Sequence, residues 1–135
     1  MPLIIGVVKG LGLEILVENA DGFVRENLVL PVIHRPSGIR VDLIFSFTPY
    51  ERGALERAKR VRVNDEEVCF ASAEDLVIHK MVAGRPRDIE DVRGILLKNP
   101  GIEKDYILHW LREFDRGSGL DLAGQFEELA ASHLK

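Results

Sequence analysis

The hydrophobic pattern of this 135-residue chain changes its period near residue 72, and that change limits the folds open to it. Before residue 72, short apolar or alternating runs predict strands over residues 13–17, 28–34, 38–45, 61–63 and 67–70. After it, apolar residues recur three and four positions apart almost to the end, which predicts helices. A β-rich half (1–71) followed by a helical half (72–135) predicts the α+β class. The length predicts a single domain with a sizeable core.

Local signals predict where the helices begin. The stretch "TPYERGALERAKR" is typical of a helix with Pro49 in its first turn. Ser72 followed by Asp75 matches a capping box, so a helix is expected over about 73–84, and Pro86 suits the first position of the next one. In the third helix, Trp110 belongs to an apolar stripe and is expected in the core rather than in a ligand site. The stripe consists of Ile107, Trp110, Leu111 and Phe114.

Composition excludes several classes of protein. The net charge of -4 argues against a dedicated nucleic-acid binder. Cys69 is the only cysteine, so the chain forms no internal disulfide, which fits a reducing cytoplasm. The N-terminal "PLIIGVV" is too short for a membrane span and lacks the basic start of a signal peptide. The four histidines, His34, His79, His109 and His133, have no zinc-ligand spacing with each other or with Cys69.

One local basic excess lies over residues 52–62, where acidic residues are interleaved with it. A solvated helix face is the favoured interpretation, and nucleic-acid contact is the alternative. The basic residues are Arg52, Arg57, Lys59, Arg60 and Arg62, and the acidic ones are Glu51 and Glu56.

Asp42 stands inside an apparently buried strand, "SGIRVDLIFSF". Alternation directs Leu43 and Phe45 to one, wholly apolar face and Arg40 and Asp42 to the other. An ionised carboxylate is costly to remove from water unless it is paired or bound to a cation. Asp42 therefore faces solvent, pairs with Arg40 or lines a site, and the pattern leaves all three open.

Charged residues also gather after the helix expected at 73–84. Lys80 falls inside the apolar arc of that helix, so its stem is expected to pack while its ammonium reaches water. The alternative is an ammonium held in a cleft as an anion contact. Asp88 falls in the first turn of the helix expected to begin at Pro86, where the helix dipole suffices to explain a carboxylate. Asp91 points further into the polar side of the same helix. Periodicity alone leaves Arg85 and Arg87 as solvated surface.

The order of these segments resembles the C-terminal part of minimal nucleotidyltransferase-fold proteins, including AbiEii-like toxins. The resemblance covers about residues 13 to 115 and is carried by "GIRVDLIFSFTPYERGALERA" and "ASAEDLVIHKMVAGRPRDIEDVRGIL". It implies a curtailed, mixed nucleotidyltransferase-like β-sheet followed by a helical half. In that family three carboxylates at the sheet edge hold divalent metal for transfer from a nucleoside triphosphate. Asp42 matches the third, and the resemblance implies Lys80 and Arg85 as triphosphate contacts.

The sequence departs from the family's pattern at its beginning. The other two carboxylates of the family follow a Gly-Ser or Gly-Gly motif as Asp-x-Asp, and this chain has neither. Asp21-Gly22 supplies one acid, which we expect in a turn. The chain would then begin after the first strands of the family's domain. One carboxylate of three holds Mg²⁺ poorly, so Asp42 would be a remnant catalytic and metal ligand.

The resemblance therefore implies a truncated or degenerate nucleotidyltransferase that is inactive as this chain stands and binds a nucleotide with Mg²⁺ weakly. Two alternatives remain open. One is a non-catalytic interaction module of the toxin–antitoxin type, and the other is an active enzyme whose true N-terminus is missing here. A sheet edge left exposed by missing strands favours a homodimer or a partner protein.

Overall fold

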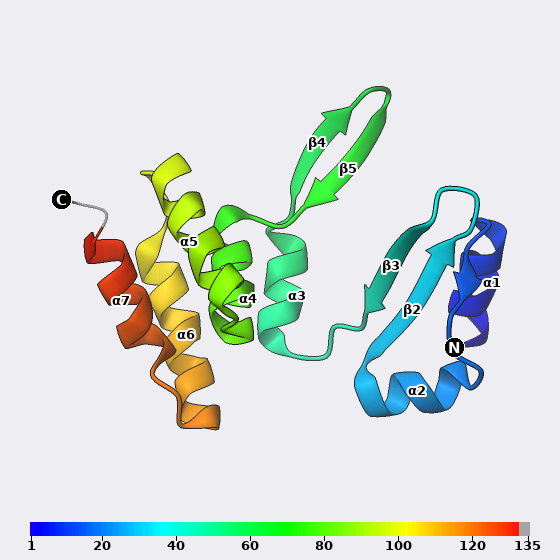
Figure 1. Cartoon of the computed structure of the whole chain (residues 1–135), viewed down its shortest axis with the longest axis horizontal. Coiled ribbons are helices and arrows are strands. Elements are labelled where there is room, and N and C mark those ends of the chain that lie inside the picture. Colours follow the sequence, from blue (N-terminus) through cyan, green and yellow to red (C-terminus); the bar gives the residue numbers. More distant parts are fainter. Residues whose placement is uncertain (133–135) are drawn as a thin grey trace. The chain divides into compact units, whose positions relative to one another are not determined.

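The computed structural model describes residues 1–132, so His133 lies outside the described residues. The chain divides into two compact units, Met1–Thr48 and Pro49–Lys135. Small antiparallel sheets with short helices come first and a four-helix region follows, which confirms the α+β class (Figure 1). The boundary between the units, after Thr48, does not coincide with the change of hydrophobic period near residue 72. Helix α3 and a β-hairpin lie between these two positions and belong to the second unit.

The first unit is a three-stranded sheet with two helices. Its strands are β1 (Glu14–Ile15), β2 (Val29–His34) and β3 (Ile39–Ile44), in the order β1-β2-β3, and its helices are α1 (Pro2–Gly10) and α2 (Ala20–Asn27). The small core is built from α1, α2 and one face of the sheet. Its buried members are Val8, Val24, Leu30 and Val32.

Two expectations for the β-rich half are wrong. Asp21-Gly22 does not form an isolated turn, because the Asn19 side chain accepts the Gly22 N–H at 3.0 Å and starts α2 there. The strands of residues 1–132 also form two separate antiparallel sheets instead of one mixed sheet. The connections 35–38 and 64–65 are short enough to require antiparallel pairing of β2 with β3 and of β4 with β5, while β1 pairs antiparallel with β2 across the longer connection that contains α2.

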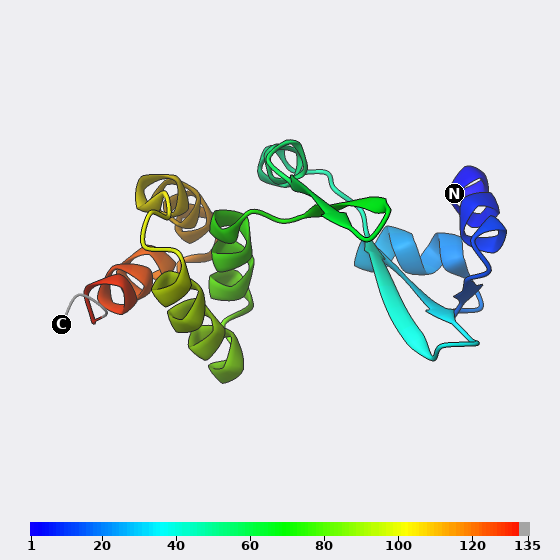
Figure 2. The same cartoon turned by 90° about the horizontal axis from the view of Figure 1, so that it is seen from above.

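The second unit begins with α3 (Pro49–Glu56) and the hairpin of β4 (Lys59–Val63) and β5 (Glu66–Phe70). Four helices follow: α4 (Ala73–Ala83), α5 (Pro86–Lys98), α6 (Lys104–Ser118) and α7 (Leu122–Ser132). Figures 1 and 2 show α4 to α7 packed together, with α4 in contact with each of the other three. The buried core includes Val77, Ile78, Met81, Val92, Ile107, Leu111 and Phe126.

The predicted helix starts and stops of this half are confirmed. Ser72 accepts the Asp75 N–H at 3.0 Å and caps α4, and Gly84 ends it in the left-handed conformation with φ of 63°. Pro86 is the first residue of α5. Trp110 packs against the core with its ring 5.1 Å from that of Tyr50, as the apolar stripe predicts. Among residues 1–132, none of the helices has both the length and the apolar character that crossing a membrane would need.

Candidate functional site

Asp42 lies on the outer face of the first unit's sheet. It is paired in register with Pro31 of β2 and is exposed, while Leu43 and Phe45 pack against the core on the other side. In the described part of the chain its carboxylate makes no ion pair with Arg40. The sequence left three possibilities for Asp42: exposure to solvent, a pair with Arg40, or a place in a site. The structure excludes the pair with Arg40 and shows the carboxylate facing solvent. A role in metal binding stays a prediction.

Four charged side chains meet where α4 ends and α5 begins, and we call them the α4–α5 cluster: Lys80, Arg85, Asp88 and Asp91. Lys80 Nζ lies 3.2 Å from Asp88 Oδ1 and 2.6 Å from Asp91 Oδ2. Arg85 approaches the same carboxylate from the other side, with Nε 2.5 Å from Asp88 Oδ2. The Asp88 side chain is only 5% exposed and that of Lys80 24%, whereas Asp91 is 45% exposed.

The backbone explains why these groups meet. Gly84 reverses the chain after α4, and Pro86 starts α5 at once, so the last turn of α4 lies beside the first turns of α5. Asp88 and Asp91 are three residues apart and therefore share one face of α5, which is turned toward Lys80. The Lys80 ammonium is held by two acids, which agrees with the alternative of a held ammonium, while the Arg85 side chain is 75% exposed, as expected of solvated surface, and also pairs with Asp88.

Hydrogen bonds within the cluster favour the charged forms of Lys80, Arg85 and Asp88. The hydrogen bond from Arg85, helped by one from Lys80, holds the pKa of Asp88 below its ordinary value. Hydrogen bonds to Asp91 and Asp88 raise the pKa of Lys80, and the bond to Asp88 raises that of Arg85. Two cations face two carboxylates, so the formal charges of the cluster cancel and a bare anion gains little from its net charge.

The sequence candidates thus fall into two sets. Lys80 and Arg85 are brought together through Asp88, while Asp42 belongs to the first unit, so its place beside them stays a prediction. Within residues 1–132, no three or more histidine, cysteine or acidic side chains are grouped so that they could hold a metal ion. A hollow of about 170 Å³ beside Leu96 and Ile102 contains none of the candidates.

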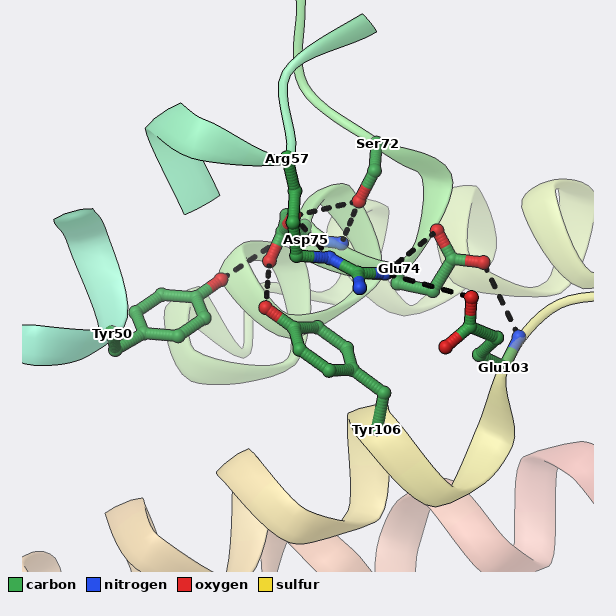
Figure 3. A network of polar contacts seen from close by, with 7 residues as sticks. All are labelled: Tyr50, Arg57, Ser72, Glu74, Asp75, Glu103 and Tyr106. Carbon is green, nitrogen blue, oxygen red and sulfur yellow. Dashed lines mark hydrogen bonds and ion pairs between the residues drawn. The ribbon is translucent and has the colours of Figure 1, made fainter. Parts of the chain in front are cut away.

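A buried polar network in the second unit was missed by sequence reasoning (Figure 3). Its centre is Asp75, whose side chain is 0% exposed. The Asp75 carboxylate accepts hydrogen bonds from the Ser72 hydroxyl at 2.6 Å and the Tyr106 hydroxyl at 2.9 Å. The Tyr50 hydroxyl donates to the Asp75 backbone carbonyl at 3.4 Å, and Arg57 Nε lies 3.7 Å from Asp75 Oδ2. Only the Ser72–Asp75 contact was expected, as a helix cap.

Arg57 extends this network toward the start of α6. Its guanidinium lies over the Tyr106 ring, 3.9 Å from the centroid, and its Nη2 is 3.9 Å from both Glu74 and Glu103. Burial raises the pKa of Tyr106 to about 12 and moves that of Tyr50 upward too, so both hydroxyls remain protonated donors. The network joins α3, α4 and the start of α6, which is a structural role.

The comparisons with known proteins add no relative. No model of a known protein family matches the sequence, and no curated protein matches it either. The resemblance to nucleotidyltransferases therefore rests on the segments around Asp42 and Lys80, and what it implies for activity is a proposal.

Proposed function

We propose that this chain is a nucleotidyltransferase-like binding protein that takes the phosphates of a magnesium nucleotide weakly at the α4–α5 cluster and does not complete nucleotidyl transfer alone. The observation that carries the proposal is the convergence of Lys80 and Arg85 on one buried carboxylate in an open helix–helix turn. The two cations stand at the positions where the resemblance implies triphosphate contacts.

The two cations suit phosphate in different ways. The Lys80 stem is packed and its ammonium is held by two acids, so its position is set before a ligand arrives. The Arg85 side chain is 75% exposed, and its planar guanidinium can turn to a phosphate in bidentate fashion while remaining near Asp88. One fixed and one adjustable cation together suit a phosphate group.

The two acids make magnesium necessary. A bare triphosphate would be repelled by Asp88 and Asp91, whereas Mg²⁺ neutralises part of that charge. Mg²⁺ keeps most of its water and is commonly held by one or two carboxylates together with substrate phosphates. Asp91 uses one oxygen for Lys80 and is half-exposed, which makes it a fitting carboxylate for such an ion.

Calorimetric titration of the full chain with ATP, with and without Mg²⁺, tests the proposal. Weak binding is expected with Mg²⁺ and none without it. Lys80→Ala and Arg85→Ala should each weaken binding about tenfold, since a hydrogen bond to a charged group contributes about 1.5–3 kcal/mol.

Arg116→Ala is the matched control for Arg85→Ala. Arg116 is equally exposed, at 74%, and pairs in the same i,i+3 manner with Glu113, but it lies on α6. This variant should bind as wild type does. Equal affinity in all four proteins, or binding that ignores Mg²⁺, would contradict the proposal.

A second candidate is a non-catalytic interaction module that works by contact. The observation in its favour is the exposed apolar side of the β4–β5 hairpin, which carries Val61, Val63, Val68 and Phe70. The same titration separates the two candidates, because the interaction module is expected to bind no nucleotide at all.

A further inference from the structure

We propose that two copies of this chain associate through one face of the β4–β5 hairpin, packed face to face about a two-fold axis. We call it the hairpin face, and it consists of Lys59, Val61, Val63, Glu66, Val68 and Phe70. The proposal does not depend on nucleotide binding at the α4–α5 cluster. Figures 1 and 2 show the hairpin standing clear of helices α4 to α7.

The register of the hairpin separates an apolar from a polar side. Val61 is paired with Val68 at the centre of the hairpin face, Lys59 with Phe70 at one end and Val63 with Glu66 at the other. The opposite side is polar and is closed by an ion pair of 3.0 Å between Arg60 and Glu67. A valine-rich side backed by a mostly charged side is typical of strands that have one side covered.

Among residues 49–132, nothing covers the hairpin face. All ten strand residues are exposed, and the four large apolar side chains are between 37% and 49% accessible. A lone two-stranded ribbon is marginally stable in water and gains stability when one face is packed. A contiguous apolar group on a polar-backed ribbon marks a contact surface.

The charges of the hairpin face favour a second copy as its occupant. The face carries one cation and one anion at diagonally opposite corners: Lys59 beside Phe70, and Glu66 beside Val63. When two such faces are stacked with their strands crossing at nearly a right angle, the two-fold axis lies between them at about 45° to the strands. Of the two such axes, one brings Lys59 of each copy nearest Glu66 of the other, within reach of these long side chains, and brings the two Phe70 side chains near each other. The surface is therefore complementary to itself.

The hairpin edges are less suited to self-association. Strand β4 carries Lys59, Arg60 and Arg62, and strand β5 carries Glu66 and Glu67. Antiparallel two-fold pairing of β4 with β4, centred on Val61, places Arg60 opposite Arg62 of the other copy, which is destabilising. Pairing β5 with β5, centred on Val68, places Glu66 opposite Phe70 and Glu67 opposite Cys69 of the other copy, so neither carboxylate gains a cation. The face, rather than an edge, is where two identical hairpins fit.

Sedimentation equilibrium of the full chain over a range of concentrations tests the proposal. Wild type should form a dimer with a dissociation constant on the order of micromolar or weaker, as small interfaces do. Val68→Thr keeps the β-branched shape and removes apolar surface, and it should raise that constant about tenfold or more. Leu55→Ser is the control: Leu55 is exposed on α3, and its variant should dimerise as wild type does.

Charge reversal makes the test specific for the crossed arrangement. Lys59→Glu and Glu66→Lys should each weaken dimerisation, because both place like charges over one another. The double variant, and an equimolar mixture of the two single variants, should associate again, since every contact is then between opposite charges. A monomeric wild type, a dimer insensitive to all of these changes, or single variants that the mixture does not rescue would overturn the proposal.

Discussion

Replacing Asp75 with alanine is expected to destabilise the second unit by about 3–5 kcal/mol, since each hydrogen bond to a charged group contributes about 1.5–3 kcal/mol. The fully buried carboxylate accepts two such bonds, at 2.6 Å from Ser72 and 2.9 Å from Tyr106. Its removal also relieves the desolvation of a buried charge, which offsets part of the loss. The ion pair with Arg57 is 3.7 Å long and one-third exposed, so it adds less than about 1 kcal/mol.

A loss of this size is large for one domain. Free energies of unfolding are typically about 5–15 kcal/mol. In a domain of 60–100 residues each kcal/mol lowers the melting temperature by about 4–8 °C, so Asp75→Ala should melt about 12 °C or more below wild type. Tyr106→Phe removes a single hydrogen bond and keeps the ring under Arg57, and it should lose only about 1–2 kcal/mol.

Urea unfolding followed by tryptophan fluorescence is the suitable assay. Trp110 is the only tryptophan in the sequence and packs edge-on against Tyr50 in the second unit, so its signal reports that unit alone. Glu113→Ala, an exposed change on α6, serves as a control and should shift stability by less than about 0.5 kcal/mol. The reasoning is refuted if Asp75→Ala loses no more stability than Tyr106→Phe does.

Three further predictions concern pH and the strand acid. The pKa of Tyr106, raised by burial to about 12, gives stability that is present below about pH 10 and lost as pH rises toward 12, so Tyr106→Phe should flatten the alkaline decline seen in thermal melts. The hydrogen bond from Arg85 lowers the pKa of Asp88, so its contribution is present above about pH 4 and lost as pH falls further. Asp88→Asn should make acid unfolding less steep, and an unchanged acid profile would argue against the α4–α5 cluster. Asp42→Asn should change the free energy of unfolding by less than about 0.5 kcal/mol, because Asp42 is exposed. A larger loss that Mg²⁺ does not influence would mean that Asp42 has a structural role.

The sequence by itself determined the features that depend on neighbouring residues. The change of period near residue 72 predicts the α+β class, because side-chain periodicity follows from the local backbone geometry of strands and helices. Ser72, Gly84 and Pro86 mark helix ends correctly, since each acts within one turn of the backbone. Alternation also predicts the face on which Asp42 lies, because side chains of a strand alternate with a period of two residues and every second one points away from the core.

Only the tertiary structure decided which distant side chains meet. Asp75 and Tyr106 are 31 residues apart, and Tyr50 reaches the Asp75 backbone across 25, so no local pattern could have joined them. Lys80 finds Asp88 and Asp91 because the turn at Gly84 folds α5 back along α4. The pairing of β1 with β2 is equally non-local, since α2 lies between them in the chain, and the strands of residues 1–132 form two antiparallel sheets where one mixed sheet was expected. The physical reason is that helix caps and alternation depend on backbone geometry a few residues long, while pairing and ion-pair partners depend on how whole elements pack.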